Sequence, residues 1–194
     1  NGFDSGDDVL NGQANYDDDI TDWVLVYLRS NPENGSEKLC SRAGLLHRDG
    51  RIEFINENQN CCQLNLNAQY YVVVEHRNHL IVMSDAPQSI VNGVLTYDFR
   101  NKQSYSEDPF GAGCISQKEV LPGVFCMFGG NGDQTASGDS DTDINSDDLN
   151  KWDVSKNLFQ VFSIPDYDMN GDVNSNDKNL WFRNTNKFTC VIRF

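Results

Sequence analysis

The stretch Asp166-Tyr-Asp-Met-Asn-Gly-Asp-Val-Asn-Ser-Asn-Asp177 carries oxygen-bearing side chains at a regular spacing near the end of the chain. Counted from its first residue, it has a carboxylate or amide at positions 1, 3 and 5, glycine at 6, an apolar residue at 8 and a carboxylate at 12. The residues at positions 1, 3, 5, 6, 7, 8 and 12 are Asp166, Asp168, Asn170, Gly171, Asp172, Val173 and Asp177. Carboxylates this close together repel one another unless a cation neutralises them, so the pattern predicts a cation site.

This order of positions is the ligand plan of the EF-hand calcium loop, with Asp instead of Glu at position 12. Side chains at alternate positions of a tight loop converge on one ion, glycine allows the sharp turn, and residue 7 contributes its backbone carbonyl. About six or seven oxygens at roughly 2.4 Å then replace the water shell of the ion. We therefore predict that a calcium ion is bound by Asp166, Asp168, Asn170, Asp172 and Asp177.

A second copy of the end of this loop lies 29 residues upstream. Residues 143–152 (Asp-Ile-Asn-Ser-Asp-Asp-Leu-Asn-Lys-Trp) match residues 172–181 (Asp-Val-Asn-Ser-Asn-Asp-Lys-Asn-Leu-Trp) at six of ten positions. Aligning the two copies places Asp143 at loop position 7 and Asp148 at position 12. The repeat therefore predicts a second calcium loop.

The early ligands of this upstream loop have two alternatives. Asp139 and Asp141 immediately precede the copy, whereas Asn131 and Asp133 lie further upstream in a Gly-Asn-Gly-Asp sequence. We prefer the second pair, with the residues in between as an insertion, because Gly-Asn-Gly-Asp is typical of the start of a loop. The predicted ligands of the first loop are Asn131, Asp133, Asp143 and Asp148.

Each copy continues into a segment with helix signals. A side-chain oxygen just before a helix accepts a hydrogen bond from one of the first free backbone N–H groups. The expected N-caps are Ser146 for the first helix and Ser175 or Asn176 for the second. The apolar residues expected to line the helix faces are Leu149, Trp152, Leu158, Leu180 and Trp181. We expect the two helices to pack together through their tryptophans.

The residues upstream of the loops have the pattern of β-strands. The strongest candidate is Tyr70-Tyr-Val-Val-Val-Glu75, and Asp49-Gly50 and Asn92-Gly93 are hairpin signals. The other expected strands are residues 23–28, 38–47, 51–55, 61–66, 80–83, 89–91, 94–97 and 124–128. Short strands with turn signals about every 8–12 residues predict a mainly β fold, and the type we expect is a seven-stranded antiparallel sandwich, Ig-like or transthyretin-like.

Charge and composition divide the chain into three parts. Residues 1–19 are rich in Gly, Asn and Asp and are expected to be an acidic linker or entry segment. A β-sandwich domain is expected in residues 20–128 and the two-loop calcium-binding region in residues 129–194. The net charge of −14 excludes nucleic acid as an expected partner, because phosphate binding needs clustered Lys and Arg. No apolar run reaches the length of about 18 residues that a transmembrane helix needs.

The cysteines and the start of the chain indicate a secreted protein. Six cysteines without a Cys-x-x-Cys pair argue against a zinc ribbon. An even count beside calcium-type loops favours an oxidising, extracellular or cell-surface setting with at least two disulfides, whose connectivity stays open. Because the sequence starts at Asn1 rather than Met, we expect a processed protein or a fragment of a longer one.

We do not expect an enzyme. The sequence has no Gly-x-Ser-x-Gly motif, no Cys-His nucleophile pattern and no phosphate loop. His76 and His79 lie three residues apart near a strand end, but no further ligand accompanies them. We interpret this segment as a structural turn in which Arg77 and Asn78 bond backbone groups.

The loops and the strands together resemble a known family. Paired DxNxDG-like loops, each followed by a short helix, are similar to the dockerin type I fold, which binds two calcium ions. Residues 20–190 resemble a C-terminal module of large secreted or surface proteins of Bacteroidota. The resemblance includes residues 22–29, 42–50 and 70–80, and its most specific string is His-Arg-Asn-His-Leu.

This resemblance implies a function without catalysis. It implies a calcium-stabilised structural or adhesion module of a secreted or cell-surface multidomain protein. The expected partners are calcium and either other domains of that protein or a surface partner protein. The alternative is a dockerin-like recognition module that docks onto a partner protein or glycan.

Overall fold

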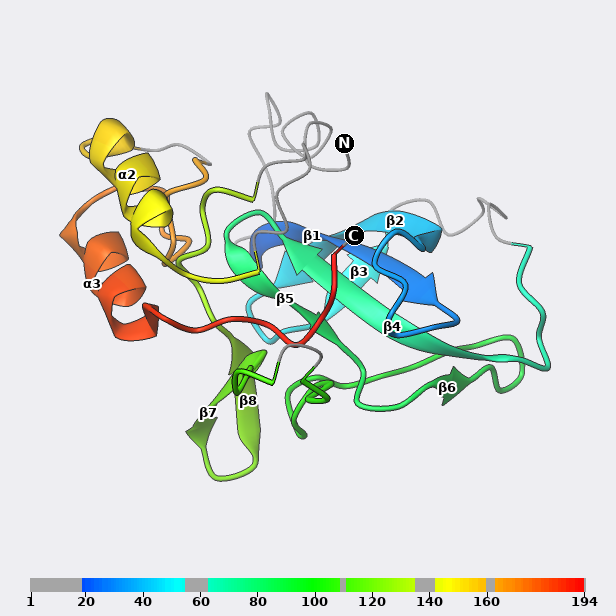
Figure 1. Cartoon of the computed structure of the whole chain (residues 1–194). Helices are drawn as coiled ribbons and strands as arrows, with labels where there is room; N and C mark the ends of the chain where they lie inside the picture. The colour runs from blue at the N-terminus through cyan, green and yellow to red at the C-terminus, as the bar shows by residue number, and fades with distance from the viewer. Residues whose placement is uncertain (1–18, 55–62, 109–110, 135–141, 160–162, 194) are drawn as a thin grey trace.

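The computed structural model describes residues 19–54, 63–108, 111–134, 142–159 and 163–193. Its strands are β1 (Ile20–Arg29), β2 (Leu39–His47), β3 (Ile52–Phe54), β4 (Gln69–His76), β5 (His79–Met83), β6 (Gln88–Ser89), β7 (Gln117–Leu121) and β8 (Val124–Met127), and its helices are α2 (Ser146–Ser155) and α3 (Ser175–Asn184). Six strands form one antiparallel sheet of order β3-β2-β1-β4-β5, with β6 paired to β4, and β7 and β8 form a separate two-stranded sheet. Helices α2 and α3 lie side by side at one end of the large sheet (Figure 1).

The centre of the large sheet is buried on both faces. Strands β1 and β4 pair with Tyr27 opposite Val73. Successive side chains of a strand point to opposite faces, so Tyr27 and Val73 join one hydrophobic cluster, whereas Val24 and Val74 join another. Burial on both faces explains the almost unbroken apolar run in residues 70–75.

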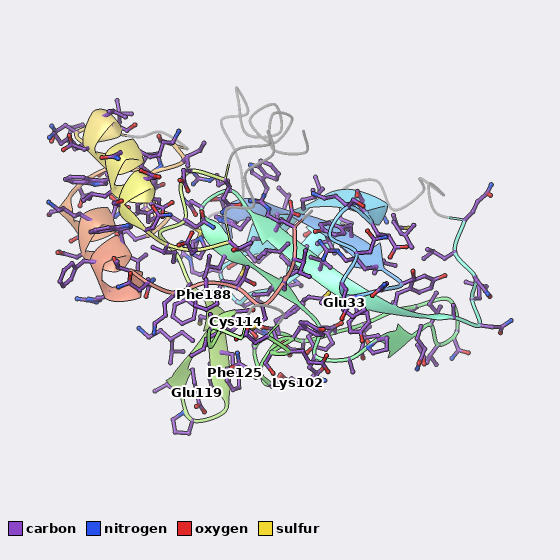
Figure 2. All side chains as sticks on the ribbon, in the orientation of Figure 1. Glu33, Lys102, Cys114, Glu119, Phe125 and Phe188 are labelled. Atoms are coloured by element: carbon purple, nitrogen blue, oxygen red, sulfur yellow. A yellow bond between two sulfur atoms is a disulfide. The ribbon has the colours of Figure 1, made fainter. Side chains whose placement is uncertain are left out.

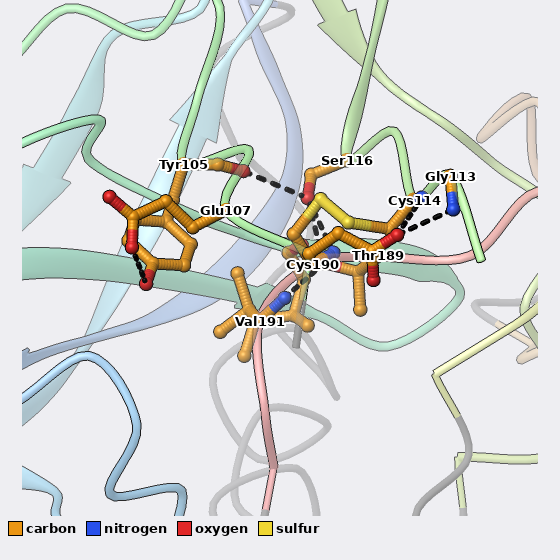
Figure 3. The surroundings of a disulfide bond; sticks show 10 residues. Tyr105, Glu107, Gly113, Cys114, Ser116, Thr189, Cys190 and Val191 are labelled. Atoms are coloured by element: carbon orange, nitrogen blue, oxygen red, sulfur yellow. Dashed lines mark hydrogen bonds between the residues drawn. A yellow bond between two sulfur atoms is a disulfide. The ribbon is translucent and has the colours of Figure 1, made fainter. Parts of the chain in front are cut away.

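The C-terminal residues pass over one face of the sheet and are fixed there by a disulfide. Cys114 and Cys190 are bonded (Figure 3), and Phe188 packs against the same cluster beside Cys114 (Figure 2). The hydroxyl of Thr189 donates a hydrogen bond of 2.7 Å to the backbone carbonyl of Ile81 in β5. The chain end is therefore tied by a covalent bond to the segment before β7 and by the hydroxyl of Thr189 to strand β5.

The other cysteines differ in state. Cys40 is also disulfide-bonded, and Cys126 is free and exposed. Cys61 and Cys62 lie outside the described residues. A disulfide-bearing chain is compatible with an extracellular location.

A third hydrophobic cluster joins the sheet to the helices. Its buried members are Leu80, Phe128, Ile144, Trp152, Tyr167, Val173 and Trp181. The backbone N–H of Leu80 in β5 donates to the carbonyl of Phe128 at 2.8 Å, so the chain enters the first loop from the edge of the sheet. The two-loop region thus shares a core with the sheet across the expected boundary at residue 128.

The mainly β, antiparallel character predicted from the sequence is confirmed. The seven-stranded sandwich is not confirmed, because the described strands divide into one sheet of six and one of two. Within the described part of the chain, none of the helices has the length and apolar character that crossing a membrane requires.

Several strand predictions need correction. Asn92 and Gly93 form a turn with φ values of 52° and 79°, but only a single bridge between Val91 and Val94 flanks it, instead of strands 89–91 and 94–97. Residues 63–66 form no strand, and the first two residues of the expected strand 61–66 lie outside the described residues.

Strand β7 is a structural feature that the sequence analysis does not predict. Four of its five residues are exposed, so it lacks the apolar alternation of a half-buried strand. It pairs with β8 across a turn at Pro122 and Gly123, whose φ of 74° suits glycine.

Candidate metal centre

Three carboxylates of the second loop converge on one point. Asp166, Asp168 and Asp177 each place an oxygen so that the three atoms lie within 4.8 Å of one another. Asp166 and Asp177 are buried, and Asp168 is half-buried. Among the residues that the structure describes, this is the one group of three or more His, Cys, Asp or Glu side chains with such spacing. These residues are positions 1, 3 and 12 of the predicted loop.

Asp177 is oriented by the start of helix α3. The backbone N–H of Asn174 donates to Asp177 Oδ2 at 2.7 Å, and the Asn174 side chain accepts from the backbone N–H of Asn176 at 2.8 Å, which is a capping box. The second oxygen, Asp177 Oδ1, accepts from the backbone N–H of Asp168 at 3.1 Å. One carboxylate therefore ties the helix start to the early part of the loop.

The loop backbone wraps around Asp166. The N–H groups of Asn170 and Gly171 each donate to one Asp166 carboxylate oxygen at 3.0 Å. Met169 and Gly171 have φ values of 60° and 88°, in the left-handed region. Glycine at position 6 meets this requirement without strain, as the EF-hand plan predicts.

The electrostatics of the second loop disfavour several negative charges at once. Burial, the largest cause, raises the pKa of Asp166 to about 6, and the charge of Asp177 adds to this shift. The N–H of Gly171 and the guanidinium of Arg77, whose Nη2 lies 3.7 Å from Asp166 Oδ2, act in the opposite direction. Burial and Asp177 also raise the pKa of Asp168. A bound cation would remove this penalty.

The remaining predicted ligands of the second loop lie beside the triad. Asn170 is exposed, and its amide nitrogen donates to Asp168 Oδ2 at 3.0 Å. The backbone N–H of Asp172 donates to Asn170 Oδ1 at 2.9 Å, and the backbone carbonyl of Asp172 accepts from Asn174 Nδ2 at 3.2 Å. The structure brings these two residues next to the triad, but it does not include their side chains in it.

The first loop holds its last carboxylate in the same way. The backbone N–H groups of Gly132 and Asp133 donate to Asp148 Oδ1 at 2.5 and 3.2 Å. The backbone N–H of Asn145 donates to Asp148 Oδ2 at 2.7 Å and completes a capping box. Relative to Asp148, Asp133 therefore occupies the place that Asp168 occupies relative to Asp177.

Of the two alternatives for the early ligands of the first loop, the hydrogen bonds to Asp148 favour the pair Asn131 and Asp133. Asp133 bonds to Asp148, and Asn131 precedes Gly132, which bonds to the same carboxylate, whereas Asp139 and Asp141 lie outside the described residues. Asp143 is half-buried, and its Oδ1 accepts from the side-chain amide of Asn145 at 3.2 Å.

Two acceptor atoms of the first loop are buried without a hydrogen-bond partner in the described structure, namely Asn131 Oδ1 and Asp133 Oδ1. Buried polar atoms are nearly always bonded, so such atoms call for a ligand, an ion or a water. Asp148 beside them is fully buried, and burial, together with a hydrogen bond and the charge of Asp133, raises its pKa to about 8. Two carboxylates and an amide oxygen form the donor set that a hard cation such as Ca²⁺ prefers.

The N-cap of α2 lies one residue earlier than the predicted Ser146, and that of α3 lies one or two residues earlier than the predicted Ser175 or Asn176. The caps are Asn145 and Asn174, and Ser146 and Ser175 are the first helical residues. The asparagines are the caps because their backbone N–H groups donate to the loop carboxylate three residues later, while their side chains accept from the first turn of the helix, so cap and carboxylate stabilise each other. Leu158 lies beyond the end of α2 and is more than a third exposed, so it does not join the helix face.

The two loop–helix units are related by a reciprocal pattern of contacts. The indole N–H of Trp152 donates to the carbonyl of Asn174, and that of Trp181 donates to the carbonyl of Asn145, both at 2.7 Å. Each tryptophan of one helix thus bonds to the N-cap residue of the other. The predicted packing of the two helices through their tryptophans is confirmed.

Backbone pairing repeats the same exchange. Ile144, at position 8 of the first loop, pairs with residues 186–187 after α3, and Val173, at position 8 of the second loop, pairs with residues 157–158 after α2. Both residues are fully buried. Each loop is therefore supported by the chain that leaves the other loop's helix.

The turn between β4 and β5 contacts the second loop. Arg77 and Asn78 bond backbone groups, as predicted: Arg77 donates to the carbonyl of Ser163, and Asn78 donates to those of Ile164 and Asp166. The sequence does not reveal that these carbonyls belong to the entry of the second loop. No local signal could have shown it, because the bonded residues are 86 or more positions apart.

No protein-family model, no curated protein and no solved structure matches this chain. The interpretation of the two loops therefore depends on their own geometry. In each loop a carboxylate is held by backbone N–H groups beside further oxygen-bearing side chains. Such an arrangement can bind a divalent cation.

Proposed function

We propose that residues 129–194 form a dockerin-like repeat that binds two calcium ions. The observation that carries this proposal is the same arrangement in both loops, in which a carboxylate held by a helix N-cap meets the first oxygen-bearing side chains of its loop. The residues that would hold the ions are Asn131, Asp133, Asp143 and Asp148 in the first loop, and Asp166, Asp168, Asn170, Asp172 and Asp177 in the second. Calcium supplies the positive charge that these oxygens lack.

The proposed role is structural. Calcium would make the end of the chain rigid within a structural or adhesion module of a secreted or cell-surface multidomain protein. The buried tryptophans support this role, because they are used to join the loops to each other and to the sheet. The disulfide between Cys114 and Cys190 supports an oxidising setting. The proposed partners are calcium and other domains of the same protein or a surface partner protein.

The alternative is a recognition module that docks onto a partner protein or glycan. Two apolar side chains on the helices favour it: Val154 is 83% exposed and Phe182 is 74% exposed. A docking role predicts that the double variant V154S/F182S keeps its calcium binding but no longer binds to the surface of the cells from which the protein comes. A structural role predicts that the double variant shows no such loss.

Thermal unfolding with and without calcium tests the calcium proposal. If calcium binds only the folded form, each site adds about 2.7 kcal/mol to the free energy of unfolding at a hundredfold excess over its Kd. We expect a higher Tm in calcium than in chelator. Magnesium at the same concentration should give a smaller shift, because it demands shorter bonds and keeps part of its water shell. Equal midpoints in millimolar calcium and in chelator would refute the proposal.

A further inference from the structure

Asn78 uses all of its hydrogen-bonding groups in the turn between β4 and β5. Its side chain is fully buried. The side-chain nitrogen Nδ2 donates to the carbonyls of Ile164 at 2.8 Å and Asp166 at 2.7 Å. The backbone carbonyl of Asn78 accepts from the N–H groups of Gly130 and Asn131, both at 3.0 Å. Both donors of the amide are therefore engaged, and both lone pairs of the backbone oxygen are used.

These bonds reach the first residue of each proposed calcium loop. Asn131 is position 1 of the first loop, and Asp166 is position 1 of the second. In both cases the bond is made to the backbone, so it fixes where the loop begins and leaves the side-chain oxygen available. The two loop entrances are therefore held by one residue of the sheet.

The sheet holds Asn78 in the orientation that this double role needs. His79 Nδ1 lies 2.7 Å from Asn78 Oδ1, which directs the amide nitrogen toward the second loop. Arg77 donates to both Asp22, at 2.7 and 2.9 Å, and the carbonyl of Ser163. The turn is thus fixed by β1 on one side and by the second loop on the other.

We propose that Asn78 is a positioning residue that couples calcium binding at the two loops. This inference rests on the proposed calcium function. When an ion orders one loop, that loop fixes Asn78 from its side, and Asn78 then holds the bonds that the entrance of the other loop needs. Binding of one ion therefore raises the affinity for the second, and the effect is reciprocal.

Calcium titration by calorimetry measures this coupling. Asp148→Asn disables the first loop and Asp166→Asn disables the second, which gives one dissociation constant for each loop alone. The coupling factor is the product of these two dissociation constants divided by the product of the two stepwise dissociation constants of the protein in which both loops are intact. We expect a factor of about 5 or more, within the usual range for coupled sites. In proteins that also carry Asn78→Asp or Asn78→Ala, we expect a factor close to 1.

Gln134→Ala is the matched control. The amide nitrogen of Gln134 also makes two hydrogen bonds to carbonyls, those of His79 in the turn and Asn131 in the first loop, at 2.9 and 3.0 Å. It joins the turn to one loop entrance only. We expect Gln134→Ala to weaken the first loop and to leave the coupling factor unchanged.

Hydrogen exchange tests the same connection without a change at Asn78. The N–H groups of Gly130 and Asn131 are bonded to the Asn78 carbonyl. In Asp166→Asn with calcium present, we expect these two amides to exchange at least several times faster than in the unchanged protein, although the substitution lies in the other loop. Unchanged exchange at both amides contradicts the coupling.

The outcomes separate the two proposals. If the unchanged protein binds no calcium, the proposed function fails. If it binds two ions but the coupling factor is 1, or if both Asn78 variants keep the full factor, calcium binding stands and the role of Asn78 is overturned. Near-UV circular dichroism in saturating calcium shows which Asn78 variants are folded, and if neither variant folds, hydrogen exchange decides.

Discussion

The two loops present similar oxygen-bearing side chains in different ways. The second loop is a continuous run of twelve residues, and its Asp166 stands where the first loop has Asn131. In the first loop, residues 134–142 separate Asp133 from Asp143, whereas only residues 169–171 separate Asp168 from Asp172. The capping boxes at the ends of both loops are nevertheless alike. The end of the loop, which continues into a helix, is therefore the constant part, and the way the chain reaches it can vary.

The loops also differ in their charge balance. The second loop has one more carboxylate at position 1, but it also has Arg77 at 3.7 Å from that carboxylate. In the first loop Asp148 faces Asp133 in a fully buried place, and its pKa rises to about 8, compared with about 6 for Asp166. The metal-free first loop is therefore the harder of the two to ionise, although it has fewer carboxylates.

The largest expected effect comes from Asp166→Ala. This substitution removes position 1 of the second loop and the acceptor of two backbone N–H groups. We expect the loss of one of two bound ions in calorimetry, with a Kd more than about 100-fold higher at that loop, because a buried charge–ion contact is lost. Asp153→Ala is the control, since Asp153 is exposed and pairs with Lys156, away from both loops. A variant Asp166→Ala that still binds two ions with unchanged affinity would contradict the assignment of this loop.

A sharper comparison comes from Asn131→Asp. It gives the first loop the carboxylate that the second loop has at position 1, and calcium affinity rises with the number of ligand charges. We expect about a tenfold lower Kd for the first loop and, in chelator, a lower Tm, because a third charge is added near Asp133 and Asp148. The measurement is calorimetry in the Asp166→Asn background, in which only the first loop binds. If affinity and metal-free stability rise together, Asn131 does not face the ion.

The loops should also differ in their dependence on pH. Calcium displaces the proton of a carboxylate whose pKa lies above the working pH. Between pH 7 and pH 6 we expect the Kd of the first loop to rise about tenfold, because Asp148 has a pKa of about 8, and that of the second loop about twofold, because Asp166 has a pKa of about 6. Titrations of the two single-loop variants at both pH values measure this. Equal pH dependence in both loops would show that the pKa of Asp148 is not the higher one.

The folding stability of the metal-free protein should fall as pH rises. A carboxyl group whose pKa is raised in the folded state binds more protons folded than unfolded, so the stability falls as pH rises. For Asp148 this contribution is present below about pH 4 and is lost as pH rises to about 8. Chelator-treated protein should therefore melt at a lower temperature at pH 8 than at pH 6. Asp148→Asn should remove a large part of this difference.

The smallest expected effect concerns what the two units share. Trp152→Phe and Trp181→Phe each remove one indole N–H bond to the N-cap carbonyl of the other helix. We expect each to reduce the free energy of unfolding in saturating calcium by about 1 kcal/mol, the usual net value of such a bond. Urea denaturation measures both values. A cost several times larger for one tryptophan would show that the two units are not energetically equivalent.

How much the sequence reveals depends on how local each feature is. The candidate triad Asp166, Asp168 and Asp177 could be named because its members lie within twelve residues. Both helices were predicted, but their caps were placed one or two residues late, since Asn and Ser are almost equally good caps and the sequence offers them side by side. Strand β8 was predicted as residues 124–128, but its hairpin partner β7 was not, because an exposed strand has little apolar alternation.

The sequence by itself determined the ligand spacing of the second loop, the repeat that predicts the first, and the central strands of the sheet. These features follow from periodicity and from interactions between residues a few positions apart, which the order of residues encodes directly. Tertiary structure decided that Asp133 meets Asp148, that each tryptophan bonds to the other unit, and that Asn78 holds both loop entrances. These contacts join distant parts of the chain, and they form only when the shared hydrophobic cluster brings the sheet and the loops together.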